Sequence, residues 1–290
     1  MSTPAPFGAR LAAAVGAHGP LCVGIDPHPG LLAAWGLADD AAGLRTFVQR
    51  VLEAVAGHVA AVKPQSALFE RHGAAGVAVL EEVVAAGREA GTLVVVDAKR
   101  GDIGSTMAGY ADAYLRDGSP LAGDALTVSP YLGFGSLAPA VEAALATGRG
   151  LFVLALTSNP EGAAVQHARD ASGRAVAATV AAEAAALNAA ELAAAGTPDG
   201  TGSVGLVVGA TVGDAPARLG LDLAAVRGPL LAPGVGAQGA GPAELAAVFG
   251  DARRHVLASS SRGVLAAGPD VPALRAAARR AADEAGAALR

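Results

Sequence analysis

Eight short apolar runs, each followed by a helical stretch rich in alanine, constrain the fold of this 290-residue chain more than any other feature. The runs predict strands at residues 21–25, 59–62, 92–96, 124–128, 151–156, 204–208, 229–232 and 255–258. Helices are predicted near residues 41–57, 69–90, 104–117, 136–147, 173–195, 212–220, 241–249 and 271–288, with an extra helix at 7–18 before the first strand. Strands that are apolar throughout are typical of a parallel sheet covered on both faces. Eight such units predict one α/β domain over residues 1–290, a (β/α)₈ barrel of the TIM type.

An open, doubly wound sheet is the alternative architecture. Such a sheet normally has fewer strands and carries a Gly-x-Gly-x-x-Gly turn after the first of them. Here residues 26–30 after the first strand read Asp-Pro-His-Pro-Gly, which is not that turn. The loop-like segment 196–203 is interpreted as a surface connection and not as a linker between domains.

Composition argues against several classes of protein. A net charge of -5 and an aromatic content of 3% do not favour a nucleic acid as partner. The one cysteine, Cys22, lies in an apolar run and is predicted to be a small buried side chain, so no disulfide framework exists. The six histidines show no spacing typical of a metal site, and we expect no metal and no cofactor. No unbroken apolar segment of 18 residues and no signal-like N-terminus occur, which predicts a cytoplasmic protein without a membrane partner.

The chain has 19 arginines but two lysines, Lys63 and Lys99, and each follows a predicted strand. Arginine is effectively always protonated, whereas lysine is a compact ammonium that can give up a proton. Codon bias could also explain the scarcity of lysine, with each one merely solubilising a strand end. The position of both lysines at strand ends favours a site instead, because polar residues at these ends converge on one mouth of such a barrel.

Acidic residues accompany the lysines at the same predicted mouth. Asp26 ends the first strand, Lys63 the second, and residues 97–103 (Asp-Ala-Lys-Arg-Gly-Asp-Ile) follow the third. Asp97 and Lys99 are two residues apart and share a face in an extended segment, while Asp102 lies beyond a glycine. Opposite charges at close range keep one another ionised. A barrel-top network of ion pairs without chemistry is the alternative, although such a network adds little stability by itself.

Two loops at the end of the barrel are suited to a phosphate group. Residues 233–239 (Pro-Gly-Val-Gly-Ala-Gln-Gly) follow the seventh strand, and residues 259–263 (Ser-Ser-Ser-Arg-Gly) follow the eighth. Glycines allow close approach of backbone N–H groups to an anion, and arginine forks onto phosphate oxygens. Barrels of this type commonly hold phosphate in these two loops.

These motifs together resemble the orotidine 5′-phosphate decarboxylase family. Residues 97–103 are similar to its Asp-x-Lys-x-x-Asp-Ile signature, and further matches follow at residues 23–27 (Val-Gly-Ile-Asp-Pro), 62–65 (Val-Lys-Pro-Gln), 104–106 (Gly-Ser-Thr), 157–160 (Thr-Ser-Asn-Pro) and 233–239. They fall in order over almost the whole chain, and their wording resembles the longer bacterial subgroup.

The resemblance implies a (β/α)₈ barrel that dimerises with its active sites at the interface. It implies conversion of orotidine 5′-monophosphate to UMP and CO₂, the last step of pyrimidine nucleotide synthesis, without metal or cofactor. It also implies roles for site residues: Lys99 as proton donor to C6, Asp97 beside the departing carboxylate, Lys63 and Asp26 at the ribose, Asp102, Ile103 and Thr106 in the partner's site, Ser158 at the pyrimidine, and Gln238, Arg262, Gly236 and Gly239 at the phosphate. Ser261 stands where many relatives have glycine, so only its backbone N–H is carried over.

Three rival functions remain from the sequence. A sugar-phosphate decarboxylase of the same superfamily shares the Asp-x-Lys-x-x-Asp motif but uses Mg²⁺ and an acid where Lys63 stands here. A Schiff-base aldolase also has a lysine at a strand end, but that lysine needs a lowered pKa, which flanking carboxylates oppose. A non-catalytic sensor of phosphoribosyl ligands would have no use for a proton donor at Lys99.

Overall fold

The structure, a computed structural model that describes residues 5–235 and 239–290, contains a closed barrel of eight parallel strands in the order of the sequence. The strands are β1 (Leu21–Ile25), β2 (Ala61–Pro64), β3 (Leu93–Arg100), β4 (Ala125–Val128), β5 (Gly150–Leu156), β6 (Val204–Val208), β7 (Leu230–Pro233) and β8 (Val256–Ser260). β1 pairs with β2 and with β8, which closes the ring. The predicted (β/α)₈ barrel is therefore confirmed, and the open sheet is excluded.

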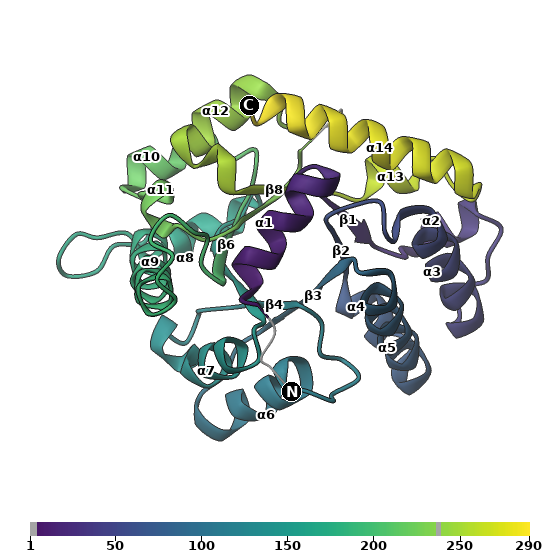
Figure 1. Ribbon diagram of the computed structural model, residues 1–290, viewed down its shortest axis with the longest axis horizontal. Helices are drawn as coiled ribbons and strands as arrows, with labels where there is room; N and C mark the ends of the chain where they lie inside the picture. Colours follow the sequence, from purple (N-terminus) through teal and green to yellow (C-terminus); the bar gives the residue numbers. More distant parts are fainter. Residues whose placement is uncertain (1–4, 236–238) are drawn as a thin grey trace.

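Helices surround this barrel (Figure 1). The α-helices are α1 (Phe7–His18), α2 (Pro29–Ala34), α3 (Ala41–Val55), α4 (Ser66–Glu70), α5 (Gly73–Ala90), α6 (Gly104–Leu115), α7 (Ala138–Ala146), α8 (Ala163–Gln166), α9 (Val176–Ala194), α10 (Ala215–Leu219), α11 (Leu223–Val226), α12 (Pro242–Phe249), α13 (Arg262–Leu265) and α14 (Val271–Ala288). Short 3₁₀ turns are η1 (Phe134–Leu137), η2 (Pro160–Gly162) and η3 (Gly250–His255).

Several element boundaries differ from the predictions. The helix predicted at 69–90 is split into α4 and α5, because the chain turns at Gly73, whose φ is +63°. The helix predicted at 212–220 is α10 followed by α11, since Gly220 ends α10 in the left-handed region. β3 runs to Arg100 instead of ending at residue 96, so the charged motif begins inside the strand.

Side chains alternate between the two faces of the barrel wall. In β3, Val94 and Val96 pack outward against the helices, whereas Leu93 and Val95 belong to a separate cluster in the barrel interior. Cys22 is fully buried in this interior cluster, as predicted. The period of two follows from strand geometry. It places the next inward positions, toward the carboxyl ends of the strands, at the mouth of the barrel.

Helix α1 closes the opposite, amino-terminal end of the barrel, where Figure 1 shows it crossing the centre of the ring. Phe7 is fully buried and packs edge-on against Phe152, with 5.9 Å between ring centroids. A Cβ at Gly150 would lie 2.1 Å from the Phe7 ring, so the close approach requires glycine there. The predicted extra helix is thus the base of the interior core.

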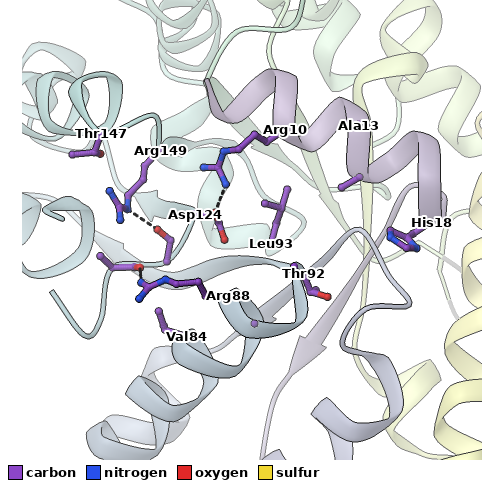
Figure 2. Close-up of a pocket in the computed structure, with 15 residues that line it drawn as sticks. Arg10, Ala13, His18, Val84, Arg88, Thr92, Leu93, Asp124, Thr147 and Arg149 are labelled. Carbon is purple, nitrogen blue, oxygen red and sulfur yellow. Dashed lines mark hydrogen bonds and ion pairs between the residues drawn. The ribbon is translucent and has the colours of Figure 1, made fainter. Parts of the chain in front are cut away.

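A cavity of about 570 Å³ lies beside α1 at this closed end (Figure 2). Arg10 reaches from α1 to form an ion pair with Asp124 and donates to the carbonyl of Gly148 at 2.8 Å. Arg88 and Arg149 donate to the backbone carbonyls of the turn that precedes β4. These arginines tie α1 and the strand starts together, at the end of the barrel that typically serves stability.

Among the described residues, α9 has the length and apolar composition that a membrane-spanning helix would need. In the structure it packs against β5, β6 and α11. Its residues Ala177, Val180 and Ala184 are buried there. Helix α9 therefore covers the outside of the barrel wall.

Candidate active site

Three polar side chains occupy inward positions on neighbouring strands at the carboxyl-terminal mouth. They are Lys63 of β2, Asp97 of β3 and Thr127 of β4, and all three are buried. Each lies two residues after an apolar residue of the interior cluster on the same strand. Buried polar side chains of this kind need partners. The barrel wall brings these three side chains together although Lys63 and Thr127 are 64 residues apart in sequence.

Asp97 is the centre of this group. Its Oδ2 accepts a hydrogen bond from Lys63 Nζ at 2.8 Å and another from Gln65 Nε2 at 3.3 Å. Its Oδ1 accepts from Lys99 Nζ at 2.6 Å and from Thr127 Oγ1 at 2.9 Å. The carboxylate is therefore surrounded by donors on both oxygens and held in one orientation.

The charges shift the ionisation of the buried members. Burial opposes ionisation of Asp97, but the adjacent Lys63 and Lys99 outweigh it and lower the pKa of Asp97 to about 2. Burial likewise opposes the charge of Lys63, but Asp97 and Asp26 outweigh it and raise the pKa of Lys63 above its ordinary value. Asp97 and Lys63 are thus an ionised pair at neutral pH.

Lys99 differs from Lys63 in exposure and backbone. Its side chain is 44% exposed, whereas that of Lys63 is 7% exposed, so the Lys99 ammonium borders the open mouth. The backbone of Lys99 has a φ of +48°, in the left-handed region that few residues other than glycine adopt. The pairing of β3 with β4 shifts register between Val96 and Arg100, and this irregularity lifts Lys99 out of the regular ladder.

A cavity of about 370 Å³ opens next to this cluster. Its lining includes Asp26, His28, Gln65, Asp97 and Lys99. Asp26 Oδ1 is buried and has no hydrogen-bond partner among the described residues. A carboxylate oxygen left in this state is costly unless another group binds it, so Asp26 is placed to accept hydrogen bonds from a ligand.

The described residues among those expected at the phosphate, Gly239, Ser261 and Arg262, follow β7 and β8. Arg262 is the first residue of α13 and is exposed, while Ser261 precedes it and is half-buried. A Cβ at Gly24 of β1 would lie 1.8 Å from Ser261 Oγ, so the serine side chain fills the space that Gly24 leaves. Gly239 is exposed after β7, whereas Gly236 and Gln238 lie outside the described residues.

The residues expected to serve a partner subunit lie in the segment after β3 and in the first turn of α6. Asp102 is half-buried, and its Oδ1 accepts from the N–H of Ile103 at 2.8 Å. Within the described part of the chain, both lysines pair with Asp97 and neither pairs with Asp102. Ile103 is 62% exposed, and Thr106 on α6 is also exposed. Asp102 has no ion pair within the described residues, and its expected place in a partner's site stays a prediction.

Ser158, expected at the pyrimidine, is exposed directly after β5. A Cβ at Gly209, after β6, would lie 3.2 Å from the Ser158 backbone nitrogen. Because Gly209 has no side chain, the segment after β5 can pack closely against the segment after β6.

Sequence reasoning missed two donors to Asp97. Gln65 lies two residues beyond Lys63, and an isolated bridge joins its backbone to Asp97. Thr127 was hidden in the apolar strand Ala-Leu-Thr-Val. A polar residue in an otherwise apolar barrel strand is a signal that could have identified it.

No group of three or more His, Cys, Asp or Glu side chains arranged to hold a metal occurs within residues 5–235 and 239–290. An assay with EDTA would test the expectation that the protein uses no metal.

The profile of the orotidine 5′-phosphate decarboxylase / HUMPS family matches residues 19–277. The orotidine 5′-phosphate decarboxylase of Salinispora arenicola is 62% identical over 283 residues, covering 98% of each chain, and that of Streptomyces coelicolor is 61% identical, covering 96% of each.

Solved structures agree with this comparison. One crystal structure is that of a Streptomyces avermitilis protein that has been assigned the same name. It is 62% identical with a TM-score of 0.92, and the match covers 99% of this chain and 97% of the Streptomyces avermitilis chain. Leishmania donovani OMP decarboxylase is 33% identical with a TM-score of 0.73, covering 96% and 97%. The resemblance seen in the sequence is therefore confirmed, and the chain belongs to the orotidine 5′-phosphate decarboxylase family.

Proposed function

We propose that this chain decarboxylates orotidine 5′-monophosphate to UMP and CO₂, as one barrel domain in the cytoplasm, in the last step of pyrimidine nucleotide synthesis. Its place in the family makes it a carboxy-lyase. The observation that carries the proposal is the Asp97 carboxylate fixed between two ammonium groups, of which Lys99 borders the open mouth. Full-length relatives that bear the decarboxylase name support the choice of substrate.

The chemistry requires a fixed cation beside the reacting carbon. Loss of CO₂ from C6 of the pyrimidine leaves an electron pair on an sp² carbon that the ring delocalises poorly. A preorganised ammonium stabilises this charge as it develops and can then supply the proton. We assign this role to Lys99, and to Asp97 the position beside the departing carboxylate. Lys63 completes the array and holds Asp97 ionised.

The remaining contacts would hold the nucleotide. Asp26, with its unpartnered buried oxygen, is suited to accept from the ribose hydroxyls together with Lys63. Ser158 would bind the edge of the pyrimidine. For the phosphate we propose Arg262, the N–H of Ser261, and the loop containing Gly236, Gln238 and Gly239. Binding energy from a phosphate remote from C6 can support orientation and loop closure at the reacting carbon.

We also propose a homodimer in which each site is shared. Ile103 and Thr106 are exposed, both lysines pair with Asp97, and we propose that Asp102, Ile103 and Thr106 reach the partner's site. The segments that follow β3 and β4 carry apolar side chains with high exposure: Ile103 at 62%, Tyr131 at 74% and Leu132 at 52%. Such exposed apolar side chains at adjacent positions favour burial against another subunit.

The rival functions are less well supported. The raised pKa of Lys63 is the opposite of what a Schiff-base lysine needs. A sugar-phosphate decarboxylase would need an acid where this chain has Lys63.

An absorbance assay of orotidine 5′-monophosphate in the presence of EDTA tests the proposal. We expect turnover that chelator leaves unchanged, because lysine ammonium groups supply the positive charge. Activity that EDTA abolishes and Mg²⁺ restores would favour the sugar-phosphate branch, and 3-keto-L-gulonate 6-phosphate is the substrate to compare in that case.

A further inference from the structure

Thr127, at the carboxyl end of β4, has none of the roles proposed above, yet it lies at the centre of the charge cluster. It is 1% exposed and faces the barrel interior. Its Oγ1 is 2.9 Å from Asp97 Oδ1 and also 2.9 Å from the backbone nitrogen of Lys99. One hydroxyl therefore contacts both a carboxylate and the main chain of the residue assigned as proton donor.

The direction of these two hydrogen bonds is determined by their chemistry. A backbone N–H can only donate, and an ionised carboxylate can only accept. The hydroxyl of Thr127 must accept from Lys99 and donate to Asp97. It has no second proton, so it cannot rotate without losing one of the two partners.

The backbone of Lys99 needs such a partner. Its N–H lies where β3 and β4 change register, and its φ of +48° is unfavourable for a residue with a side chain. A single residue in this region persists only when its surroundings hold it. Besides donating through its backbone to Thr127, Lys99 donates through its side chain to the same Oδ1 of Asp97 that Thr127 contacts. Thr127, Lys99 and Asp97 thus form a closed ring of hydrogen bonds.

We infer that Thr127 is a positioning residue for the decarboxylation: its hydroxyl fixes the backbone of Lys99 and the carboxylate of Asp97 relative to each other, so that the ammonium meets the reacting carbon. This inference rests on the proposed function. Thr127 acts through Lys99 and Asp97 and is not a catalytic residue itself. A small displacement of a catalytic group can reduce the rate by about 100-fold, which is why a hydroxyl outside the reaction can matter.

The first test needs no substrate, because the chain contains two lysines. Protein labelled with [¹⁵N]lysine gives two backbone amide signals, which Lys63→Arg assigns. Thr127→Val removes the hydroxyl at nearly constant volume. We expect it to shift the Lys99 signal and to speed its exchange with D₂O about fivefold or more, the effect of one hydrogen bond. The Lys63 signal should keep its exchange rate, and Thr127→Ser should restore that of Lys99.

The second test measures turnover. In Thr127→Val we expect kcat to fall about 10- to 100-fold while KM changes less than about threefold, since the phosphate and ribose contacts lie elsewhere. Thr127→Ser should recover most of kcat. Thr92→Val is the matched control: Thr92 is 3% exposed at the amino end of β3, and its hydroxyl accepts from Gly57 N–H at 2.6 Å. It should lower stability to a similar extent and leave kcat unchanged.

The outcomes separate this inference from the proposed function. Failure of the wild type to convert orotidine 5′-monophosphate overturns the proposed function, and with it the catalytic part of the inference. If the wild type turns over the substrate but Thr127→Val leaves both kcat and the Lys99 exchange rate unchanged, the inference alone is overturned. The same holds if Thr92→Val loses as much kcat as Thr127→Val, or if Thr127→Ser does not restore kcat. If Thr127→Val does not fold, Thr127→Cys, with a weaker hydrogen-bonding group of similar size, is expected to give smaller changes in the same direction.

Discussion

Lys99 shows how this chain uses a lysine where it otherwise uses arginine. The ammonium is 2.6 Å from Asp97 Oδ1, the backbone is held by Thr127, and the side chain is 44% exposed toward the mouth. A compact point charge with a transferable proton fits this position. A planar guanidinium would spread the charge and retain its proton.

We therefore expect Lys99→Arg to retain less than a few per cent of wild-type kcat, although the charge is conserved. The guanidinium does not give up a proton at the required rate, and its fork does not fit a site built for one nitrogen. Steady-state kinetics measure the loss, while an unchanged melting temperature and UMP affinity verify that the variant is folded. Substantial residual activity would mean that charge alone suffices and that Lys99 is not the proton donor.

Asp97 gives a second prediction, on stability and pH. Asp97→Asn leaves the buried ammonium of Lys63 without its main counter-charge, and we expect a loss of about 3–5 kcal/mol at pH 7. The folded-state pKa of about 2 is below the ordinary value of 3.8, so the unfolded chain takes up the proton first as pH falls. The stabilisation is complete above about pH 5 and is lost through the window from 3.8 to about 2.

Urea unfolding of wild type and Asp97→Asn between pH 3 and pH 7 measures this dependence. The difference in unfolding free energy should be constant from pH 7 to 5 and should shrink below pH 4. A difference that stays constant down to pH 3 would contradict the lowered pKa of Asp97.

What could be predicted at this scale depended on local sequence. Asp97 and Lys99 are two residues apart on one strand, so their shared face follows from the pleat, and Lys63 follows from its strand end. Thr127 contacts them only because β4 lies next to β3 in the closed barrel. The stagger between strands sets that contact, and no local pattern contains it.

At the scale of elements, regular strands and long helices were predictable, while their interruptions were not. The apolar runs identified all eight strands, because each is buried on both faces. The break between α4 and α5 depends on the turn at Gly73, and a Cβ at Gly76 would lie 2.0 Å from the carbonyl oxygen of Phe69, so the helices meet too closely for a side chain at position 76. Helix α1 was predicted as a helix, but its place across the barrel base was not.

The attachment of α1 gives a prediction of its own. Arg10→Ala removes an ion pair with Asp124 and donors to two carbonyls, so we expect a loss of about 1.5–3 kcal/mol in unfolding free energy. kcat should be unchanged, because Arg10 lies at the end of the barrel opposite to Lys99. Chemical unfolding and steady-state kinetics measure both. Arg279→Ala, an exposed arginine on α14, is the control and should change neither. A fall in kcat at unchanged stability would contradict the division between the two ends.

At the scale of the whole molecule, the barrel has one closed end and one open end. Helix α1 and its arginines seal the amino-terminal end, while the charge cluster and its cavity lie at the carboxyl-terminal mouth. We propose that Asp102, Ile103 and Thr106, in the segment after β3 and at the start of α6, serve the site of a second subunit. A second subunit placed over them would complete two sites at once, because a twofold interface uses the same surface on both chains.

Complementation between inactive variants tests whether the sites are shared. Lys99→Ala and Asp102→Ala should each be inactive alone. In a heterodimer of the two, one site combines the intact Lys99 of one chain with the intact Asp102 of the other, so activity should reappear at up to about half the wild-type level per heterodimer. The matched control mixes Lys99→Ala with Asp97→Ala. Those two residues bond to each other within one chain, so neither site of that heterodimer is complete and the mixture should stay inactive. If the first mixture also stays inactive after subunit exchange has been verified by mass spectrometry, Asp102 serves its own chain and the shared-site proposal is wrong.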